Sequence, residues 1–229
     1  MVVIYYKNSR DMMVEFQDEH KAKVKCQKST FEKGTVSNPF HPTVYGIGYL
    51  GILPELNVSL RDYRPYNIWR MMLRRCYQSE VSKSYKSYEE CYVCEEGHCF
   101  SNFLKWHNEN YYEIKDVEMH LDKDILKKGN KVYSPSTCIY TPQDVNKLFT
   151  TQHQKRKYPQ GVFYHKKDKV FVYYSHKYRK TIEGCKTSEE AYSCYIKDKQ
   201  ETIVERAEFY KKYIPSELYE ALINYKVVA

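Results

Sequence analysis

The spacing of apolar side chains changes along the chain and predicts a mixed α+β architecture. Residues 2–6 and 12–16 are β-rich runs separated by a polar turn at 8–11, so short strands are expected in the first 50 residues. From residue 66 onward apolar residues recur at helical spacing, and after residue 159 the two-residue period of strands returns. A small N-terminal β module is therefore expected to precede a helical central region and a second group of strands.

Three helices are predicted between residues 66 and 150. Two of them are amphipathic, with apolar residues gathered on one face. Their buried faces are expected to contain Ile68, Trp69, Met72, Leu73 and Cys76 in the first helix, and Phe100, Phe103, Leu104 and His107 in the second. The third helix is short and carries Val145, Leu148 and Phe149. It is expected to begin at Thr141 and Pro142, an N-cap followed by proline in the first turn.

Residues 161–164, 170–175 and 178–183 are predicted to form three antiparallel strands joined by polar turns. A long helix should follow them, because Thr187 and Glu190 have the spacing of a capping box. Its apolar face is expected to consist of Tyr192, Ile196, Ile203, Ala207 and Tyr210. Residues 214–216 are expected to end this helix, and a last short helix follows.

The polar, basic stretch at 152–157 has the composition of a linker. We therefore expect an N-terminal β module at 1–57, a central α+β domain at 58–152 and a C-terminal domain at 158–229. No apolar run reaches the roughly 18–20 residues that span a bilayer, and the first residues become polar too soon for a signal peptide. A cytoplasmic protein with no membrane partner is the expectation.

Positive charge is concentrated in one part of the chain. The formal net charge is +8, from 37 basic and 29 acidic residues. Ten of the basic and two of the acidic residues lie between 155 and 186, which leaves 27 of each elsewhere. A basic block of this kind attracts a phosphate backbone. A Lys-rich surface that serves solubility is the other interpretation.

Eight cysteines occur without an expected export signal, which favours free thiols or a metal site over a disulfide framework. Cys91 and Cys94 form a C-x-x-C pair, and His98 and Cys99 follow closely. These four residues are the weak candidates for a zinc site, because C-x-x-C is a chelating turn in zinc ribbons and fingers. The favoured interpretation is packed thiols rather than bound Zn²⁺.

Four segments of the central region carry a recognisable series of motifs. They are 69–77 (WRMMLRRCY), 121–124 (LDKD), 133–138 (YSPSTC) and 143–146 (QDVN). Their order and spacing resemble the phage variant of the HNH (His-Me finger) endonuclease family. The resemblance implies that the central domain is an HNH-like α+β domain containing a ββα element. In an active member of the family, such a domain hydrolyses DNA.

The chemistry of that family identifies the candidate catalytic residues. A His-Me finger uses a histidine general base and one divalent cation held by Asp, His or Asn groups. Lys123 stands at the position of the histidine, and a lysine with its reference pKa of roughly 10.4 is a poor base at neutral pH. Thr137 replaces the central asparagine. The remaining candidates are His120, Asp122 and Asn146, with Mg²⁺ as the cofactor if the protein is an active nuclease. His120 and Asp122 are two residues apart, so on a strand they share one face.

A second series of motifs lies in the C-terminal part. It comprises 161–162 at the start of the first strand, 170–175 as the second strand, 179–180 before the third, and 187–192 with Tyr195 in the helix. This series resembles the APETALA2-type DNA-binding domain of plant transcription factors and phage homing-endonuclease-like proteins. The resemblance implies a three-stranded antiparallel sheet packed on a long helix, with one sheet face in the DNA major groove.

The candidates for DNA contact are cations and polar or aromatic side chains of these strands and turns. They are Tyr164, His165, Lys167, Tyr173, Ser175, Lys177, Arg179 and Lys180. The sequence does not decide which face of the strands meets DNA, because residues 170–174 are apolar on both faces. A cationic sheet that binds protein is the alternative interpretation.

The leading expectation is a phage or mobile-element DNA-binding protein, in which the HNH-like domain is degenerate and the APETALA2-like sheet binds duplex DNA. The first alternative is an active, metal-dependent homing-type endonuclease, so whether the protein is an enzyme stays open. The second alternative is a phage effector that binds and inhibits a host protein. Salt-sensitive DNA binding separates the first two from the third, and Mg²⁺-dependent nicking separates the first two from each other.

Overall fold

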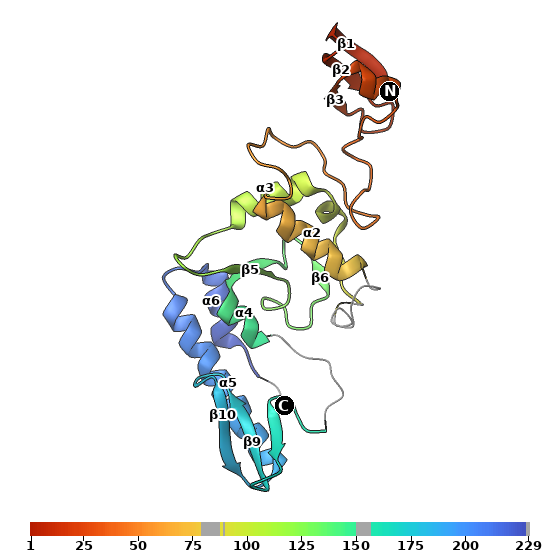
Figure 1. Ribbon diagram of the computed structural model, residues 1–229. Helices are drawn as coiled ribbons and strands as arrows, with labels where there is room; N and C mark the ends of the chain where they lie inside the picture. The colour runs from red at the N-terminus through yellow and green to blue at the C-terminus, as the bar shows by residue number, and fades with distance from the viewer. Residues whose placement is uncertain (79–87, 89, 150–156, 228–229) are drawn as a thin grey trace. The chain divides into compact units, whose positions relative to one another are not determined.

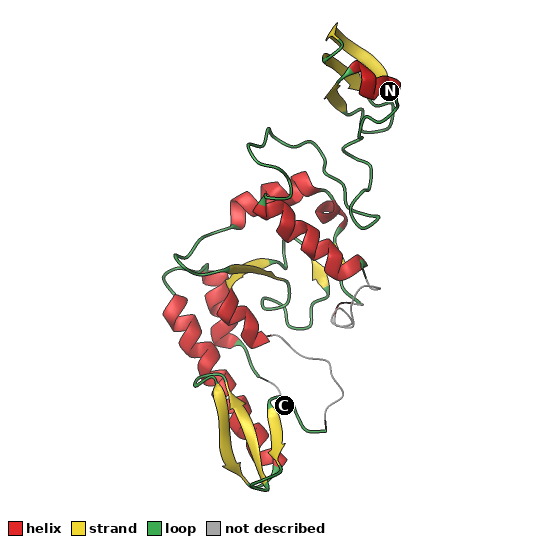
Figure 2. Ribbon diagram, in the orientation of Figure 1, coloured by secondary structure: helices red, strands yellow, loops and turns green. Residues whose placement is uncertain are grey.

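The computed structural model describes residues 1–78, 88, 90–149 and 157–227 (Figure 1). The chain divides into two compact units. The first unit comprises Met1–Glu109 and Val132–Pro135, and the second comprises Asn110–Lys131 and Ser136–Ala229. Both units mix helices and strands (Figure 2), which confirms the expected α+β class. The expected division into domains at 1–57, 58–152 and 158–229 stays a prediction, and most of the expected linker lies outside the described residues.

The first unit begins with a three-stranded sheet in the order β1–β2–β3. Its strands are β1 (Val2–Asn8), β2 (Asp11–Glu15) and β3 (Lys23–Cys26), followed by α1 (Lys28–Glu32). The first two strands and the turn between them were expected. The N-terminal sheet buries few side chains, since the whole of β1 is exposed and α1 has no buried residue.

The core of the first unit lies between α2 (Arg64–Tyr77) and α3 (Phe100–Asn110). Both helices were expected, and Trp69, Leu73 and Phe100 are completely buried. The indole Nε1 of Trp69 donates a hydrogen bond of 2.8 Å to the carbonyl oxygen of Gly97. A Cβ at Gly48 would lie 2.4 Å from Cδ1 of Leu73, so the glycine lets its loop approach the core helix closely. Two short parallel strands, β4 (Tyr92–Val93) and β6 (Val132–Tyr133), and a 3₁₀ turn at Glu95–His98 complete the unit.

The second unit contains a ββα element. Strands β5 (Met119–Asp122) and β7 (Ile139–Pro142) are antiparallel, and α4 (Gln143–Phe149) follows directly. The helix therefore begins at Gln143, one residue after the proline that was expected in its first position. Thr141 and Pro142 belong to β7 because they pair with His120 and Met119 of β5, so strand pairing extends to the last residue before the helix.

The remaining strands of the second unit form a sheet in the order β10–β9–β8, which packs on α5 (Figures 1 and 2). These elements are β8 (Val162–His165), β9 (Val170–Ser175), β10 (Lys180–Cys185) and α5 (Ser188–Tyr210), and α6 (Ser216–Asn224) is the last helix. This arrangement was expected. The Thr187 hydroxyl accepts a hydrogen bond of 3.1 Å from the Glu190 N–H. The Glu190 carboxylate accepts one of 2.7 Å from the Lys186 N–H, one residue before the usual partner in a capping box.

The buried stripe of α5 differs from the expected one in its first half. Ala191 and Tyr195 are buried there, whereas Tyr192 and Ile196 are half-buried. The reason is that the two halves of α5 face different partners. The first half packs on the sheet through a cluster of Val162, Cys185 and Ala191. The second half joins α4 and α6 in a separate core, to which Ile203, Ala207 and Tyr210 contribute as expected.

The backbone at Gly161 lies close to the Tyr195 ring of α5. Its φ is +79°, and a Cβ there would lie 2.3 Å from a ring carbon of Tyr195. Gly129 has a similar φ of +76° with no atom within 4 Å of its Cβ position, so the two glycines differ only in the available space.

We predict that Gly161→Ala destabilises the protein more than Gly129→Ala. The second substitution introduces only left-handed backbone strain, which costs about 1–2 kcal/mol. The first adds overpacking against Tyr195, worth about 1–3 kcal/mol more. Urea unfolding followed by circular dichroism measures both free energies of unfolding. Equal losses in the two variants would show that the sheet and helix do not pack this closely.

Candidate nucleic-acid interface and candidate catalytic cluster

The strand register decides which face of the C-terminal sheet is covered by α5. Val162 pairs with Tyr173, and Tyr164 pairs with Phe171. Paired residues of an antiparallel sheet lie on the same face. Because Val162 is buried in the cluster that includes Ala191 of α5, this set of residues faces the helix. The alternate residues of each strand, such as Phe163 and Tyr174, therefore form the outward face. The sequence of β9 did not decide between the two faces, because its residues are apolar on both.

The outward face presents aromatic side chains around a buried centre. Phe163 is 51% exposed and pairs with Val172, which is only 3% exposed. Tyr174 is 37% exposed and pairs with the exposed Thr181. Large aromatic rings that remain exposed beside a small buried residue form an apolar surface available for contact, and stacking or apolar contacts with bases use such surfaces.

Cations lie at both ends of this sheet. Lys166, Lys167 and Lys169 follow the end of β8, and Arg179 and Lys180 lie where β10 begins. All five side chains are exposed. The six residues of β9 separate the two groups, and at about 3.3 Å per residue a strand of that length covers roughly 20 Å. The basic charge of residues 155–186 is therefore distributed over both ends of the sheet.

The structure separates the sequence-based candidates for DNA contact into two sets. His165, Lys167, Arg179 and Lys180 are exposed. Tyr164 and Tyr173 belong to the face that packs on α5, although Tyr164 is 39% exposed at the strand end. Ser175 is completely buried, and the ammonium of Lys177 forms an ion pair with Glu205 of α5. We therefore remove Tyr173 and Ser175 from the interface.

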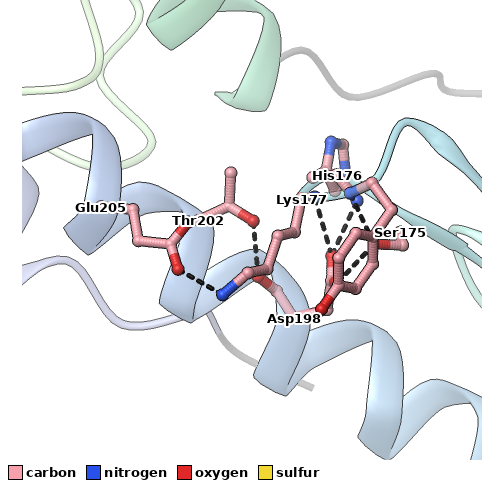
Figure 3. A network of polar contacts seen from close by, with 7 residues as sticks. Ser175, His176, Lys177, Asp198, Thr202 and Glu205 are labelled. Carbon is pink, nitrogen blue, oxygen red and sulfur yellow. Dashed lines mark hydrogen bonds and ion pairs between the residues drawn. The ribbon is translucent and has the colours of Figure 1, made fainter. Parts of the chain in front are cut away.

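Ser175 takes part in a buried polar network centred on Asp198 of α5 (Figure 3). The Asp198 carboxylate accepts hydrogen bonds from the Ser175 hydroxyl at 2.6 Å and from the His176 backbone N–H at 2.7 Å. The Ser175 hydroxyl in turn accepts one of 3.1 Å from the Tyr178 N–H. The Thr202 hydroxyl donates one of 2.7 Å to the Asp198 carbonyl oxygen. This network holds the turn between β9 and β10, and with it Arg179, on the helix.

Three exposed side chains on the sheet form a small group of potential metal ligands. They are His165, Asp168 and Glu183, whose ligand atoms lie within 4.8 Å of one another. His165 and Asp168 are also hydrogen-bonded to each other. The group places negative charge beside the lysines of the β8–β9 turn, at one end of the sheet.

The ββα element assembles a second polar cluster around His120. The His120 Nδ1 lies 3.2 Å from the Asn146 amide nitrogen. Its Nε2 lies 3.3 Å from a Glu118 carboxylate oxygen and 3.3 Å from the Gln143 amide nitrogen. Gln143 also donates a hydrogen bond of 2.6 Å to Glu118. His120 and Asn146, two of the candidate residues, thus meet.

Sequence reasoning missed Glu118 and Gln143 as members of this cluster. Both could have been found from spacing. Glu118 is two residues before His120 and so projects from the same side of an extended segment. Gln143 and Asn146 are three residues apart on α4, where such residues are neighbours.

The hydroxyl of Thr141 adds an unsatisfied polar group near this cluster. Thr141 pairs with His120 across the two strands and is completely buried. Its Oγ1 has no hydrogen-bond partner within the described structure. Buried hydroxyls are normally hydrogen-bonded, and an exception is found where a water or ligand completes the site.

Asp122 is held by its own loop. Its carboxylate accepts hydrogen bonds from the backbone N–H groups of Asp124 at 2.8 Å and Ile125 at 2.7 Å. Burial and the neighbouring Asp124 carboxylate raise the pKa of Asp122 to about 6, although the two N–H groups oppose this shift. None of the described hydrogen bonds joins Asp122 to His120.

Lys123 is buried and bonded within the same loop. Its ammonium donates hydrogen bonds to the Asn130 carbonyl oxygen at 2.9 Å and to the Asp124 carboxylate at 3.1 Å. The Asn130 side chain returns a hydrogen bond of 2.7 Å to the Lys123 carbonyl oxygen. Lys123 therefore closes this loop, and its charge is already paired.

The cysteine-rich segment does not assemble a metal-binding group in the described residues. None of the eight cysteines forms a disulfide within the described residues. Cys91, Cys94, His98 and Cys99 do not bring three ligand atoms within 4.8 Å of one another. His98 Nε2 instead lies 3.1 Å from the Tyr77 hydroxyl, and Cys99 Sγ lies 3.1 Å from the Ser101 hydroxyl. Whether the protein binds Zn²⁺ stays a prediction.

Comparison with protein-family models, with curated proteins and with solved structures found no match for this chain. In the described ranges, every helix is too short or too polar to cross a bilayer.

We predict that Asp122 titrates near pH 6 in the folded protein. Its pKa is raised above the ordinary value of 3.8, so the folded state binds more protons between these two pH values. The contribution of Asp122 to the free energy of unfolding should therefore fall as the pH rises from about 4 to about 6. NMR titration of the carboxyl carbon measures the pKa directly.

Asp124→Asn should lower the pKa of Asp122, because it removes the neighbouring negative charge. Asp116→Asn, at an exposed position, is the matched control and should leave the pKa of Asp122 unchanged. A pKa of Asp122 below 4 in the parent protein would contradict the buried position of this carboxylate.

Proposed function

We propose that this protein binds double-stranded DNA through the outward face of the β8–β10 sheet. The proposal rests on one observation: exposed cations lie at both ends of the sheet, and exposed aromatic rings lie between them. Lys166, Lys167 and Lys169 supply the positive charge at one end, and Arg179 supplies it at the other. Lys180 is exposed beside Arg179, but its pairing with Ser175 places it on the α5 side of the strand. Phosphate contacts account for affinity and base contacts for specificity, and this surface offers side chains for both.

The dimensions of the sheet are consistent with this proposal. The major groove is about 12 Å wide and admits a small β-ribbon. A strand of six residues, at roughly 20 Å, is longer than the groove is wide, so its two ends reach toward the flanking phosphate backbones. Phe163 and Tyr174 would then face base edges or thymine methyl groups. His165 and Glu183 lie close together at the edge of this surface, and the Glu183 carboxylate would weaken contact with phosphate.

We further propose that the ββα element does not hydrolyse the DNA, as in a phage or mobile-element protein with a degenerate HNH-like domain. The support comes from Lys123, whose ammonium is buried and donates to Asn130 and Asp124. A side chain engaged in this way does not take a proton from water at neutral pH. The element would then serve as a structural partner for α5 and α6, with which it shares a core.

An active, metal-dependent endonuclease is the second candidate function. One observation favours it: His120 and Asn146 are 3.2 Å apart, and the unsatisfied hydroxyl of Thr141 belongs to the residue paired with His120. In this case His120 would act as the general base, and a divalent cation such as Mg²⁺ would stabilise the leaving oxygen.

Removing the basic ends of the sheet should weaken DNA binding. We predict that replacing Lys166, Lys167, Lys169 and Arg179 with Gln lowers the slope of log affinity against log salt. The slope should fall by roughly 0.9 for each phosphate that the protein no longer neutralises. Fluorescence anisotropy with a labelled duplex over a salt series measures both affinity and slope.

The matched control replaces four exposed lysines elsewhere, Lys105, Lys115, Lys127 and Lys212, with Gln. Both variants lose the same net charge, so only the position of the charge differs. The control should retain most of the affinity and slope of the parent. Equal weakening in the two variants would assign the effect to overall charge and would refute the sheet as the DNA-binding surface.

Purified protein is expected not to cleave duplex DNA in Mg²⁺ or Mn²⁺, because loss of a general base alone removes a factor of roughly 10²–10⁴ in rate. A supercoiled-plasmid nicking assay, run beside the binding measurement, tests this prediction. His120→Ala should bind DNA as the parent does. If the parent nicks DNA and His120→Ala binds DNA without nicking it, the protein is an endonuclease and the proposal of a degenerate domain is wrong.

A further inference from the structure

Strand β1 is an edge strand whose apolar side chains are uncovered. It pairs with β2 on one side only, because the sheet order is β1–β2–β3. Its segment from Met1 to Tyr6 consists entirely of large apolar or aromatic residues, each 39–55% exposed. An exposed apolar edge strand is a template for pairing with another strand, and soluble proteins usually protect such edges with charge, proline or a covering element.

The N-terminal sheet also lacks a core of its own. Among the residues of its strands and their connections, Met12, Val14 and Ala22 are the buried apolar side chains, and α1 buries none. Small β modules need more burial than this to offset the entropy of ordering their chain. The sheet would gain the missing burial if a further strand covered β1.

Both sides of β1 are apolar, which favours an added strand over a partner packed on one face. Val3 and Tyr6 pair with Val14 and Met12, so they share the buried face of β2. Tyr5 pairs with Met13 and therefore lies on the opposite face. The register shifts between Val3 and Tyr5, so Ile4 is an inserted residue that brings apolar side chains to both faces. A neighbouring strand contacts the side chains of both faces at once.

We infer that β1 pairs antiparallel with β1 of a second copy of this chain, about a twofold axis between Ile4 and Tyr5. This register places Ile4 opposite Tyr5 and Val3 opposite Tyr6, and the second pair shares one sheet face as cross-strand partners must. Both pairs join a β-branched residue with an aromatic one, a favourable combination across strands. Lys7 falls opposite Val2, so the pairing opposes no like charges. The strand is thus complementary to itself, as a twofold interface requires.

The uncovered surface is large enough for a specific dimer. With accessible areas of roughly 150–250 Å² for large side chains, six residues at the observed exposures offer about 500 Å² per copy. If the pairing covered all of this surface, two copies would bury about 1,000 Å², the threshold for a specific protein–protein interface. The dimer is independent of the proposed function, because none of its contacts involves the β8–β10 sheet.

Analytical ultracentrifugation of the full chain over a concentration series tests the dimer. We expect the parent to dimerise and Ile4→Lys to weaken the dimer by at least about tenfold in Kd, because the substitution places two ammonium groups beside the twofold axis. Tyr213→Lys is the matched control, since Tyr213 is 61% exposed in the second unit, and it should dimerise as the parent does.

A charge-complementation experiment separates pairing from misfolding. Ile4→Glu alone should also be monomeric, whereas an equimolar mixture of Ile4→Lys and Ile4→Glu should form a heterodimer, because opposite charges now lie beside the axis. Circular dichroism should show the same secondary structure in all variants. A parent that stays monomeric at its highest soluble concentration, or a dimer that Ile4→Lys leaves intact, would overturn the inference. So would failure of the mixture to associate.

Discussion

The hydrogen bonds of the buried Asp198 carboxylate determine how the C-terminal sheet sits on α5. A charged group inside a protein is tolerated only when its lone pairs are satisfied, and here the Ser175 hydroxyl and the His176 N–H satisfy them. Both donors come from the end of β9 and the turn that follows it. The turn is therefore oriented by the helix, and the position of Arg179 depends on a contact that is not itself part of the outward surface.

The helix α5 connects the candidate binding surface to the ββα element. Its first half buries the sheet, and its second half shares a core with α4 and α6. A rigid helix that belongs to two cores couples their stabilities, since unfolding either core exposes part of the other. This coupling supplies a physical reason to retain the ββα element in the absence of hydrolysis, because the helix that supports the sheet also needs it.

The ββα element has two polar clusters, one around Asp122 and Lys123 and one around His120. They differ in the hydrogen-bond partners of their side chains. Lys123 and Asp122 are engaged by the backbone and side chains of their own loop, which is how structural polar residues are satisfied. His120 is instead surrounded by the side chains of Glu118, Gln143 and Asn146, with the unsatisfied Thr141 hydroxyl on its cross-strand partner. Any ligand chemistry in this element is therefore expected at His120 rather than at Lys123.

The sequence by itself determined the α+β class, the two amphipathic helices, the three C-terminal strands and the capped helix after them, because these follow from local periodicity and capping residues. Tertiary structure decided the features that depend on partners distant in the chain. The exposed face of β9 could not be predicted, because its residues are apolar on both sides and only pairing with β8 and packing on α5 distinguish them. Only the folded chain places Asp198 and Glu205 of α5 beside Ser175 and Lys177, so the sequence did not predict the contacts that these two side chains make. The exposure of β1 is likewise a tertiary property, since its sequence is that of a buried strand and no described part of the chain covers it.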